Sequence, residues 1–421
     1  MRNIHYLPTN AQRIALFGLF GVGNLGNEAT LAAALHHLRA LMPNAEFVCI
    51  CADPTDVAGR HAVNAIPLRQ PAQPHESLAS HGVIRLLQRI PLELKRWISI
   101  YRALGNIDLL VVPGTGILDD FGVGPLQMPY DLFRWSLLAK LQGVRIRFMS
   151  IGAGPIHHPL SRWLMKFAAN CADYRSYRDQ ISKTFMHDIG LDTSNDLVYP
   201  DLVFSLPRPV STARAHTEPA TPTVGLGVMA YYGWRNQATT GEQIYQSYLA
   251  KLTRFALWLL EKGYAIRLLI GEMSDQRAVL ALIAAITVAA GQHGQAQLIV
   301  EQIDSLSDLL QQIAATDLVV ATRFHNVLGA LMMNKPTISL GYAQKNDVLM
   351  AEMGLGDYCQ QIESFDVEQL IQHFTALEAN APQVHALIQA KNRQYERELR
   401  EQYAQILEQE RPAVAEVMSR I

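Results

Sequence analysis

The chain has 421 residues, with 36 Lys and Arg against 38 Asp and Glu. Apolar residues make up 49% and charged residues 18%, which is enough to bury sizeable cores and excludes a disordered chain. A net charge of -2 provides no global basic field, which argues against a dedicated nucleic-acid binder.

The length is typical of two domains. Three further features of the sequence predict a soluble, cytoplasmic protein. The first residues, MRNIHYLPTNAQR, contain no apolar core of a signal peptide. The longest apolar run, 279–290, is shorter than the roughly 20 residues that a membrane-spanning helix needs. The four cysteines are too few and too scattered for a disulfide framework or a zinc cage, and we expect small core side chains at Cys49, Cys51, Cys171 and Cys359.

Apolar strands alternate with helices in the first half of the chain. Strands are expected at 13–20 (RIALFGLF), 46–51 (EFVCIC), 108–112 (DLLVV) and 145–151 (RIRFMSI), with helices at 29–41 and 131–142 among the intervals. Continuous hydrophobicity is typical of strands covered on both faces, as in a parallel sheet. Residues 1–206 are therefore predicted to form a doubly wound, Rossmann-like α/β domain.

Four prolines at 207–222 predict a linker, after which the alternation restarts. Strands are expected at 223–228, 265–271, 297–300, 317–321 and 336–340, within a second Rossmann-like domain over 223–380. Residues 381–421 form a predicted C-terminal helical segment, with a largely exposed helix at 383–410. Two such domains place the default site in the cleft between them.

The first motif, 18–29 (GLFGVGNLGNEA), follows a strand and precedes a helix. Gly21 to Gly26 formally match the dinucleotide pattern G-x-G-x-x-G, and Asp53 could hold a ribose. However, Glu28 would repel a phosphate at the helix start, whereas it could bond a sugar hydroxyl or act as a base. The alternative is a tight turn capped by Asn27.

Two further strand-end segments carry polar residues. In 112–120 (VPGTGILDD), Asp119 and Asp120 could bind a metal or shape a turn. In 172–179 (ADYRSYRD), which follows the 150–155 loop (SIGAGP), Arg175 and Arg178 could bind an anion in a bidentate manner, with Asp179 holding one guanidinium. The alternative is a structural Arg–Asp pair.

The segment 317–345 (DLVVATRFHNVLGALMMNKPTISLGYAQK) is the most informative. Arg323 and His325 leave one strand end, and Lys345 leaves the next. Because the ends of neighbouring parallel strands meet at one edge, two cations and a histidine should converge on one cleft. That arrangement suits an anionic substrate that needs proton transfer.

The segment 85–102 has five basic residues and one acid among Leu, Ile and Trp. It could be an amphipathic surface that docks on anionic lipid at the inner membrane surface. Pro91 is expected to interrupt it, which favours an ordinary solvated helix.

These motifs together resemble the polysaccharide pyruvyl transferase family. The resemblance rests on GVGNLGNEA, PGTGILDD, SIGAGP, YRD, PDLVFSL and above all TRFHNVLGALMMNKPTISLGYAQK, in order from about Gly18 to about Leu355. It implies a GT-B-like fold and transfer of a pyruvyl group from phosphoenolpyruvate, as co-substrate, onto two hydroxyls of a saccharide that is often lipid-linked. The product is a cyclic ketal, and no metal or other cofactor is implied.

The resemblance also implies roles for individual residues. His325 matches the family's essential histidine, and Arg323, Lys345 and Arg178 match its donor-side cations. The N-terminal loops should face the acceptor, with Glu28 as a second catalytic candidate and with acceptor contacts expected at Asn24, Asn27, Thr115 and Asp120. The family more often has Gly-Asp-Glu where this chain has Gly26-Asn27-Glu28, and Gln where it has Asp119.

Three alternatives stay open from the sequence. They are a GT-B glycosyltransferase that uses a nucleotide sugar, an NAD-dependent Rossmann oxidoreductase, and a saccharide-binding relative without turnover.

Overall fold

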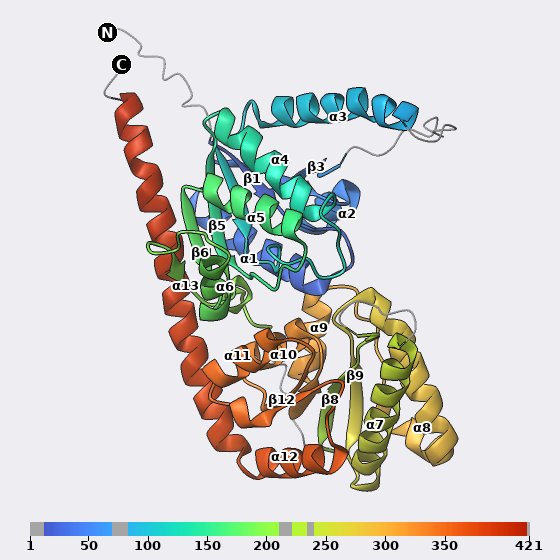
Figure 1. Cartoon of the computed structure of the whole chain (residues 1–421). Helices are drawn as coiled ribbons and strands as arrows, with labels where there is room; N and C mark the ends of the chain where they lie inside the picture. The colour runs from blue at the N-terminus through green and yellow to red at the C-terminus, as the bar shows by residue number, and fades with distance from the viewer. Residues whose placement is uncertain (1–11, 70–82, 210–220, 234–239, 419–421) are drawn as a thin grey trace. The chain divides into compact units, whose positions relative to one another are not determined.

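The computed structural model describes residues 12–69, 83–209, 221–233 and 240–418 (Figure 1). The chain divides into two units. The N-terminal unit comprises Met1–Val22, Thr30–Leu202 and Gln402–Ile421, and the C-terminal unit comprises Gly23–Ala29 and Val203–Glu401. The first eleven residues and most of the predicted linker, 210–220, lie outside the described residues.

The described part of the N-terminal unit contains a sheet of seven parallel strands in the order β3-β2-β1-β4-β5-β6-β7. This is the doubly wound order: the chain adds strands toward one edge up to β3 and then toward the other edge from β4, so the strand order switches between β1 and β4. The strands are β1 (Arg13–Phe17), β2 (Glu46–Cys51), β3 (Asn64–Pro67), β4 (Leu109–Pro113), β5 (Arg145–Ile151), β6 (Tyr174–Tyr177) and β7 (Leu197–Val198).

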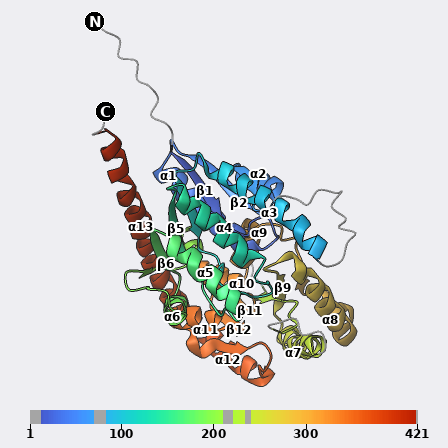
Figure 2. The same ribbon diagram turned by 45° about the horizontal axis from the view of Figure 1, so that its top comes forward.

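Helices connect these strands and cover the sheet. They are α1 (Leu25–Leu41), α2 (Pro54–His61), α3 (Val83–Leu104), α4 (Met128–Leu141), α5 (Pro159–Cys171) and α6 (Gln180–Asp188). Side chains of α3, α4 and α5 share one apolar core with the strands, and Figures 1 and 2 both show α4 beside α5. The helix α3 runs through Pro91 without a break, so the expected interruption there is wrong.

The C-terminal unit repeats the same topology. Its described residues form a six-stranded parallel sheet in the order β10-β9-β8-β11-β12-β13, which reverses direction between β8 and β11. The strands are β8 (Thr223–Gly227), β9 (Ala265–Leu269), β10 (Leu298–Ile299), β11 (Leu318–Ala321), β12 (Thr337–Gly341) and β13 (Cys359–Gln361). The predicted fold class, two Rossmann-like α/β domains, is confirmed.

The helices of this unit are α7 (Gly241–Glu261), α8 (Gln276–Ala296), α9 (Leu306–Ala314), α10 (Phe324–Met332), α11 (Gln344–Glu352) and α12 (Val367–Ala379). The stretch Met273–Gly291 has a mean hydropathy of 1.4, and it alone among the described helices is long and apolar enough to cross a membrane. Only 28% of it is buried, and one such helix is weak evidence because helices of soluble proteins pass the same test.

The last helix, α13 (Ala381–Met418), was expected to be largely exposed. The structure instead buries a stripe of side chains along it, at Val384, Ile388, Asn392, Tyr395, Leu399, Gln402, Tyr403 and Ile406. The spacing of three and four residues places them on one face. Asn392 and Gln402 are polar residues of this buried stripe, which composition alone would place at the surface. The Nδ2 of Asn392 donates to the carbonyl of Leu331 at 2.8 Å, and the Nε2 of Gln402 donates to the hydroxyl of Ser176 at 2.7 Å.

The two units differ from the sequence-based boundaries, 1–206 and 223–380, in two places. Residues 203–206 group with the C-terminal unit because Phe204 packs against Tyr395 of α13, with ring centroids 5.0 Å apart. Gly23–Ala29 also groups there, because this loop pairs with the loop that follows β9.

Candidate functional site

Arg323 and His325 lie at the carboxyl edge of the C-terminal sheet. Arg323 directly precedes α10, and His325 belongs to the first turn of that helix. The preceding Thr322 is fully buried, and its hydroxyl donates to the carbonyl of Gly227 at the end of β8, at 3.3 Å. The two side chains therefore leave the sheet between β8 and β11, at its topological switch point, where open α/β sheets bind ligands.

Carboxylates from the loop after β9 hold Arg323 in place. Its Nε and Nη2 donate to the two oxygens of Asp275 at 2.9 and 2.7 Å, and its Nη1 lies 2.9 Å from Oε2 of Glu272. Burial disfavours the charge, but the hydrogen bonds and charge of Asp275, with Glu272, raise the pKa of Arg323 above its ordinary value. Asp275 is fully buried, and it also accepts the backbone N–H of Ala230 at 3.0 Å. Arg323 is thus a fixed cation that donates to two acids.

The glycine loop before α1 is shaped by its own side chain at Asn24. Gly21 and Gly23 have φ angles of 77° and 74°, a conformation that favours glycine. The Oδ1 of Asn24 accepts the backbone N–H groups of Gly26 at 3.1 Å and Asn27 at 3.2 Å. Asn24, not Asn27, therefore caps α1. The backbone N–H groups of Gly26 and Asn27, which a pyrophosphate would need, already donate to the side chain of Asn24.

The same loop lies against the histidine. Asn24 forms an antiparallel bridge with Glu272, next to the Arg323 cluster. A Cβ atom placed on Gly26 would lie 1.9 Å from Nδ1 of His325, so the imidazole occupies the space that a side chain would take. Glu28 is buried in the first turn of α1, the helix that this loop precedes.

Lys345 follows the neighbouring strand, β12, and lies in the first turn of α11. Its ammonium nitrogen lies 5.7 Å from the ring centroid of Phe324 and 5.1 Å from that of Tyr342. The ring of Phe324 is also in contact with His325, with centroids 5.2 Å apart. The structure therefore brings Arg323, His325 and Lys345 to one edge of the C-terminal sheet, around Phe324.

Asn326 is a buried polar side chain that the sequence reasoning missed. It is fully buried, and neither its Oδ1 nor its Nδ2 has a hydrogen-bond partner among the described residues. A Cβ atom on Gly271 would lie 2.8 Å from its Oδ1 and 2.9 Å from Cβ of Arg323. A side chain at position 271 would therefore displace both residues, and an unsatisfied amide beside a candidate site is a feature that a ligand or an ordered water can complete.

The third predicted donor-binding residue, Arg178, belongs to the N-terminal unit. Its guanidinium lies against Gly152, where a Cβ atom would approach it to 2.7 Å. Arg178 forms ion pairs with Asp201 at 3.3 Å and with Asp179 at 3.5 Å. The neighbouring Arg175 is a structural residue, as one alternative expected, but its acid is Asp196 at 2.8 Å.

The remaining predicted acceptor residues also lie in the N-terminal unit. Thr115 is buried at the carboxyl end of β4. Oδ2 of Asp120 accepts the backbone N–H groups of His157 and His158, each at 2.8 Å. Oδ1 of Asp119 accepts the N–H of Phe121 at 3.1 Å. Both acids thus shape turns, which was the alternative to metal binding.

The oxidoreductase alternative fits the geometry poorly. Its proposed ribose ligand, Asp53, caps α2 by accepting the N–H groups of Thr55 at 2.9 Å and Asp56 at 3.1 Å. Among the residues that the structure describes, no group of three or more His, Cys, Asp and Glu side chains is placed to hold a metal ion.

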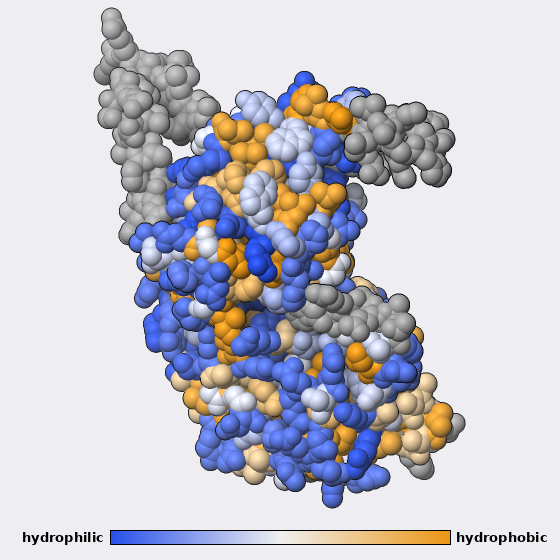
Figure 3. Space-filling view, in the orientation of Figure 1, coloured by the Kyte–Doolittle hydropathy of each residue, from blue (hydrophilic) through white to orange (hydrophobic). Residues whose placement is uncertain are grey.

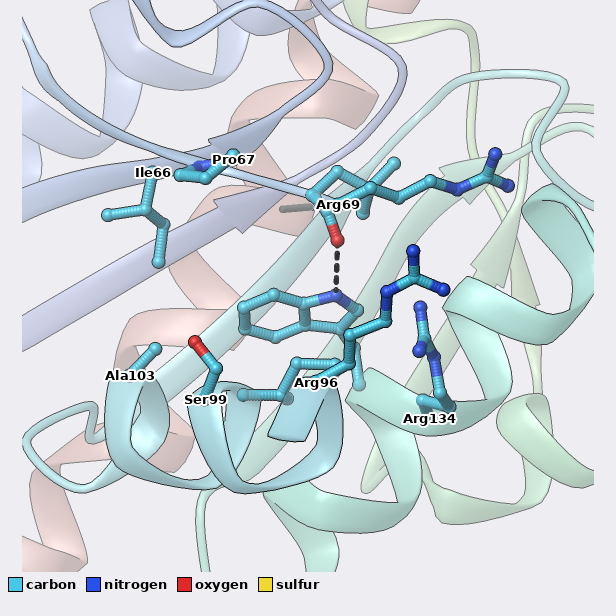
Figure 4. A pocket seen from close by; sticks show the side chains of 10 residues that line it. Ile66, Pro67, Arg69, Arg96, Ser99, Ala103 and Arg134 are labelled. Carbon is cyan, nitrogen blue, oxygen red and sulfur yellow. Dashed lines mark hydrogen bonds between the residues drawn. The ribbon is translucent and has the colours of Figure 1, made fainter. Parts of the chain in front are cut away.

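A cavity of about 210 Å³ lies beneath α3 in the N-terminal unit (Figure 4). Its floor is apolar and includes Trp135, whose Nε1 donates to the carbonyl of Leu68 at 3.3 Å. Figure 4 shows the guanidinium groups of Arg96 and Arg134 close together at one side of the cavity, with that of Arg69 farther out. Asp131 pairs with Arg69 and Arg134, and Glu93 pairs with Arg134 and Arg96, so the network ties α3 to α4.

Solved structures with the same fold include a glycosyltransferase and sugar epimerases. The glycosyltransferase from Rickettsia africae is 11% identical, with a TM-score of 0.57 over 95% of this chain and 99% of that one. UDP-GlcNAc 2-epimerase from Neisseria meningitidis is 10% identical, with a TM-score of 0.57 over 90% and 94%. At these identities the likeness shows the fold alone.

Sequence comparison is more specific. The amylovoran biosynthesis protein AmsJ of Erwinia amylovora is 20% identical over 377 residues, which are 84% of this chain and 88% of that protein. The model of the polysaccharide pyruvyl transferase family matches residues 24–344, from the glycine loop to the start of α11. Because this match spans most of the chain, the protein belongs to the polysaccharide pyruvyl transferase family and is a transferase.

Proposed function

We propose that this pyruvyl transferase takes phosphoenolpyruvate as its donor and forms a cyclic ketal on a saccharide that serves in polysaccharide biosynthesis. The observation that carries the proposal is that Arg323, His325 and Lys345 lie at one edge of the C-terminal sheet, around the ring of Phe324. The donor has a carboxylate and a phosphate, which need cations, and an enol carbon, which needs a proton.

The residues divide the work according to their surroundings. Lys345 supplies an ammonium group beside the ring of Tyr342 and binds one anionic group of the donor. Arg323 is fixed by Asp275 and Glu272, and a guanidinium has five N–H groups, so it can still donate to an anion. Glu272 is partly exposed, and the donor carboxylate competes with it for Nη1.

His325 is the proposed acid and base. It delivers a proton to the methylene carbon of phosphoenolpyruvate, which becomes a methyl group and leaves an oxocarbenium-like centre at the adjacent carbon. One sugar hydroxyl attacks that carbon and gives its proton to His325. The carbon–oxygen bond to phosphate then breaks, a second hydroxyl of the sugar closes the ring, and its proton leaves with phosphate.

The acceptor side is proposed at the glycine loop. Glu28 is buried two residues after Gly26, and Asn27 between them is half-buried, so both can meet a sugar hydroxyl near His325. A saccharide acceptor is consistent with the similarity to AmsJ, an amylovoran biosynthesis protein. The catalysis takes place in the cytoplasm, where phosphoenolpyruvate is available, and needs no metal or nicotinamide.

Donor binding tests the proposal without knowledge of the acceptor. Phosphoenolpyruvate should raise the melting temperature of the purified full chain, because a ligand that binds only the folded state stabilises it. Lys345→Ala should reduce that rise, and exposed Lys95→Ala is the matched control. Stabilisation by UDP-GlcNAc or GDP-mannose and not by phosphoenolpyruvate would favour the nucleotide-sugar alternative instead.

A further inference from the structure

The outer face of α3 carries a row of large apolar side chains. Ile90, Leu94, Ile98 and Tyr101 are between 42% and 60% exposed, and their spacing of four, four and three residues places them on one side of the helix. A surface helix that faces only water has polar residues on its outer side. An exposed row of this kind marks an interaction surface.

Aromatic rings connect this row on α3, through α4, to exposed apolar side chains on α5. Trp97 of α3 contacts Phe133 of α4, with centroids 6.4 Å apart, and Phe133 contacts Trp163 of α5, at 5.6 Å. Trp163 is 52% exposed, and Leu160 lies exposed one turn before it. We call Ile90, Leu94, Ile98, Tyr101, Leu160 and Trp163 the α3–α5 patch. Figure 3 shows apolar residues gathered on the face of this unit that carries α4 and α5.

Cations border the patch. Lys95 and Arg102 are exposed and directly follow Leu94 and Tyr101, so they line one side of the row, and Arg162 is exposed next to Trp163. Beneath α3, three guanidinium groups face two carboxylates, which leaves one positive charge in excess. Apolar side chains, interfacial Trp and Tyr, and flanking cations are together the features of a surface that inserts into an anionic membrane interface.

The alternative occupant is a second copy of the chain. Such an interface would need acids to meet Lys95 and Arg102. Glu93 is the single acid in the sequence of α3, and it already binds Arg134 at 2.6 Å and the hydroxyl of Tyr130 at 3.0 Å. The patch therefore complements anionic lipid better than it complements itself.

We propose that the α3–α5 patch docks the N-terminal unit on a membrane that contains anionic lipid. This surface lies on elements that contribute none of Arg323, His325 and Lys345. The inference does not depend on the donor or the acceptor, because vesicle binding requires neither.

Cosedimentation of the full chain with vesicles tests the proposal. The protein should bind vesicles of equal parts phosphatidylcholine and phosphatidylglycerol, bind pure phosphatidylcholine weakly, and dissociate at high salt. Lys95→Gln with Arg102→Gln should lower the affinity about tenfold or more. Leu94→Gln with Ile98→Gln should also release the protein, and all four residues are exposed, so folding should be preserved.

The matched control lies on α8, where Leu280 and Val288 are 67% and 89% exposed. Leu280→Gln with Val288→Gln removes similar apolar area and should leave vesicle binding unchanged. Equal binding to both vesicle types, or no binding to either, would overturn the proposal. A wild-type dimer that Leu94→Gln with Ile98→Gln converts to a monomer, without any vesicle binding, would assign the patch to a second copy.

Discussion

The imidazole of His325 occupies the place of the missing side chain of Gly26, since a Cβ atom there would lie 1.9 Å from Nδ1. This contact joins two motifs that are 299 residues apart in the chain, the glycine loop and the first turn of α10. In the dinucleotide pattern, the glycine at this position would let the backbone approach a pyrophosphate. Here Gly26 instead makes room for the imidazole of His325. The glycine allows the helix start that carries Asn27 and Glu28 to reach the histidine.

Gly26→Ala should therefore displace His325 and lower the rate of pyruvyl transfer about a hundredfold or more, because positioned acid–base catalysis is lost. Binding of phosphoenolpyruvate, measured as thermal stabilisation, should change little. Gly59→Ala in α2 is the matched control, since its Cβ would meet nothing within 4 Å and the rate should stay at the wild-type value. An unchanged rate in Gly26→Ala would show that the contact is unimportant for catalysis.

Removal of one carboxylate should improve donor binding. Glu272→Gln frees Nη1 of Arg323 from its 2.9 Å ion pair and removes a negative charge that repels an anionic donor. We expect a lower KM for phosphoenolpyruvate in Glu272→Gln and a higher KM in Arg323→Ala, because the latter removes the charge-assisted contact itself. The two changes are measured in the same steady-state assay. A higher KM in both variants would contradict the competition between Glu272 and the donor.

Asp275 should matter for stability as well as for the site. It is fully buried and accepts two hydrogen bonds from Arg323, so Asp275→Ala leaves a mostly buried guanidinium without its bidentate acceptor. Loss of one member of a buried ion pair costs about 3–5 kcal/mol. Urea unfolding of the variant should show this loss of free energy, whereas Asp304→Ala, at an exposed acid on the loop before α9, should show little. A loss below about 1 kcal/mol would mean that Arg323 does not depend on Asp275.

Cys359 should resist alkylation in the folded protein. Burial, with the nearby charges of Asp347 and Asp357, raises the pKa of this thiol to about 12. The unfolded chain releases the proton at about pH 8.5, so this thiol makes folding less favourable as the pH rises from about 8.5 to 12. Iodoacetamide at pH 9 should label Cys359 slowly until urea is added, and Cys359→Ala should weaken the loss of stability at alkaline pH. Rapid labelling of the native chain would contradict the raised pKa.

The sequence was most informative where strands are buried on both faces. Residues 46–51 and 145–151 form strands with the predicted bounds, because a continuous apolar run leaves no other structure that buries it. The strands β3, β6, β7 and β13 went unpredicted: they have two to four residues, and β3, β6 and β13 mix polar with apolar side chains. Their structure depends on neighbours in the sheet, which a local pattern does not contain.

The site shows the same division. The alternation of strands and helices was enough to place Arg323, His325 and Lys345 at adjacent strand ends. The partners of Arg323 were not predicted, since Asp275 is 48 residues away in the chain and follows a different strand. A search for acids after each apolar strand would have found it, because 265–271 is followed by Glu272 and Asp275. No sequence pattern indicated that Gly26 and His325 would touch.

Proton NMR of the reaction in D₂O tests the central claim most directly. The full chain is incubated with phosphoenolpyruvate and a panel of methyl hexopyranosides, and the vinyl protons of the donor and any new methyl signal are followed. Delivery of an exchangeable proton by His325 predicts a methyl group with one deuterium on the acceptor, with release of phosphate in equal amount, and a rate at least about a hundredfold lower in His325→Ala. A near wild-type rate in His325→Ala, or transfer from UDP-GlcNAc with phosphoenolpyruvate unchanged, would contradict it.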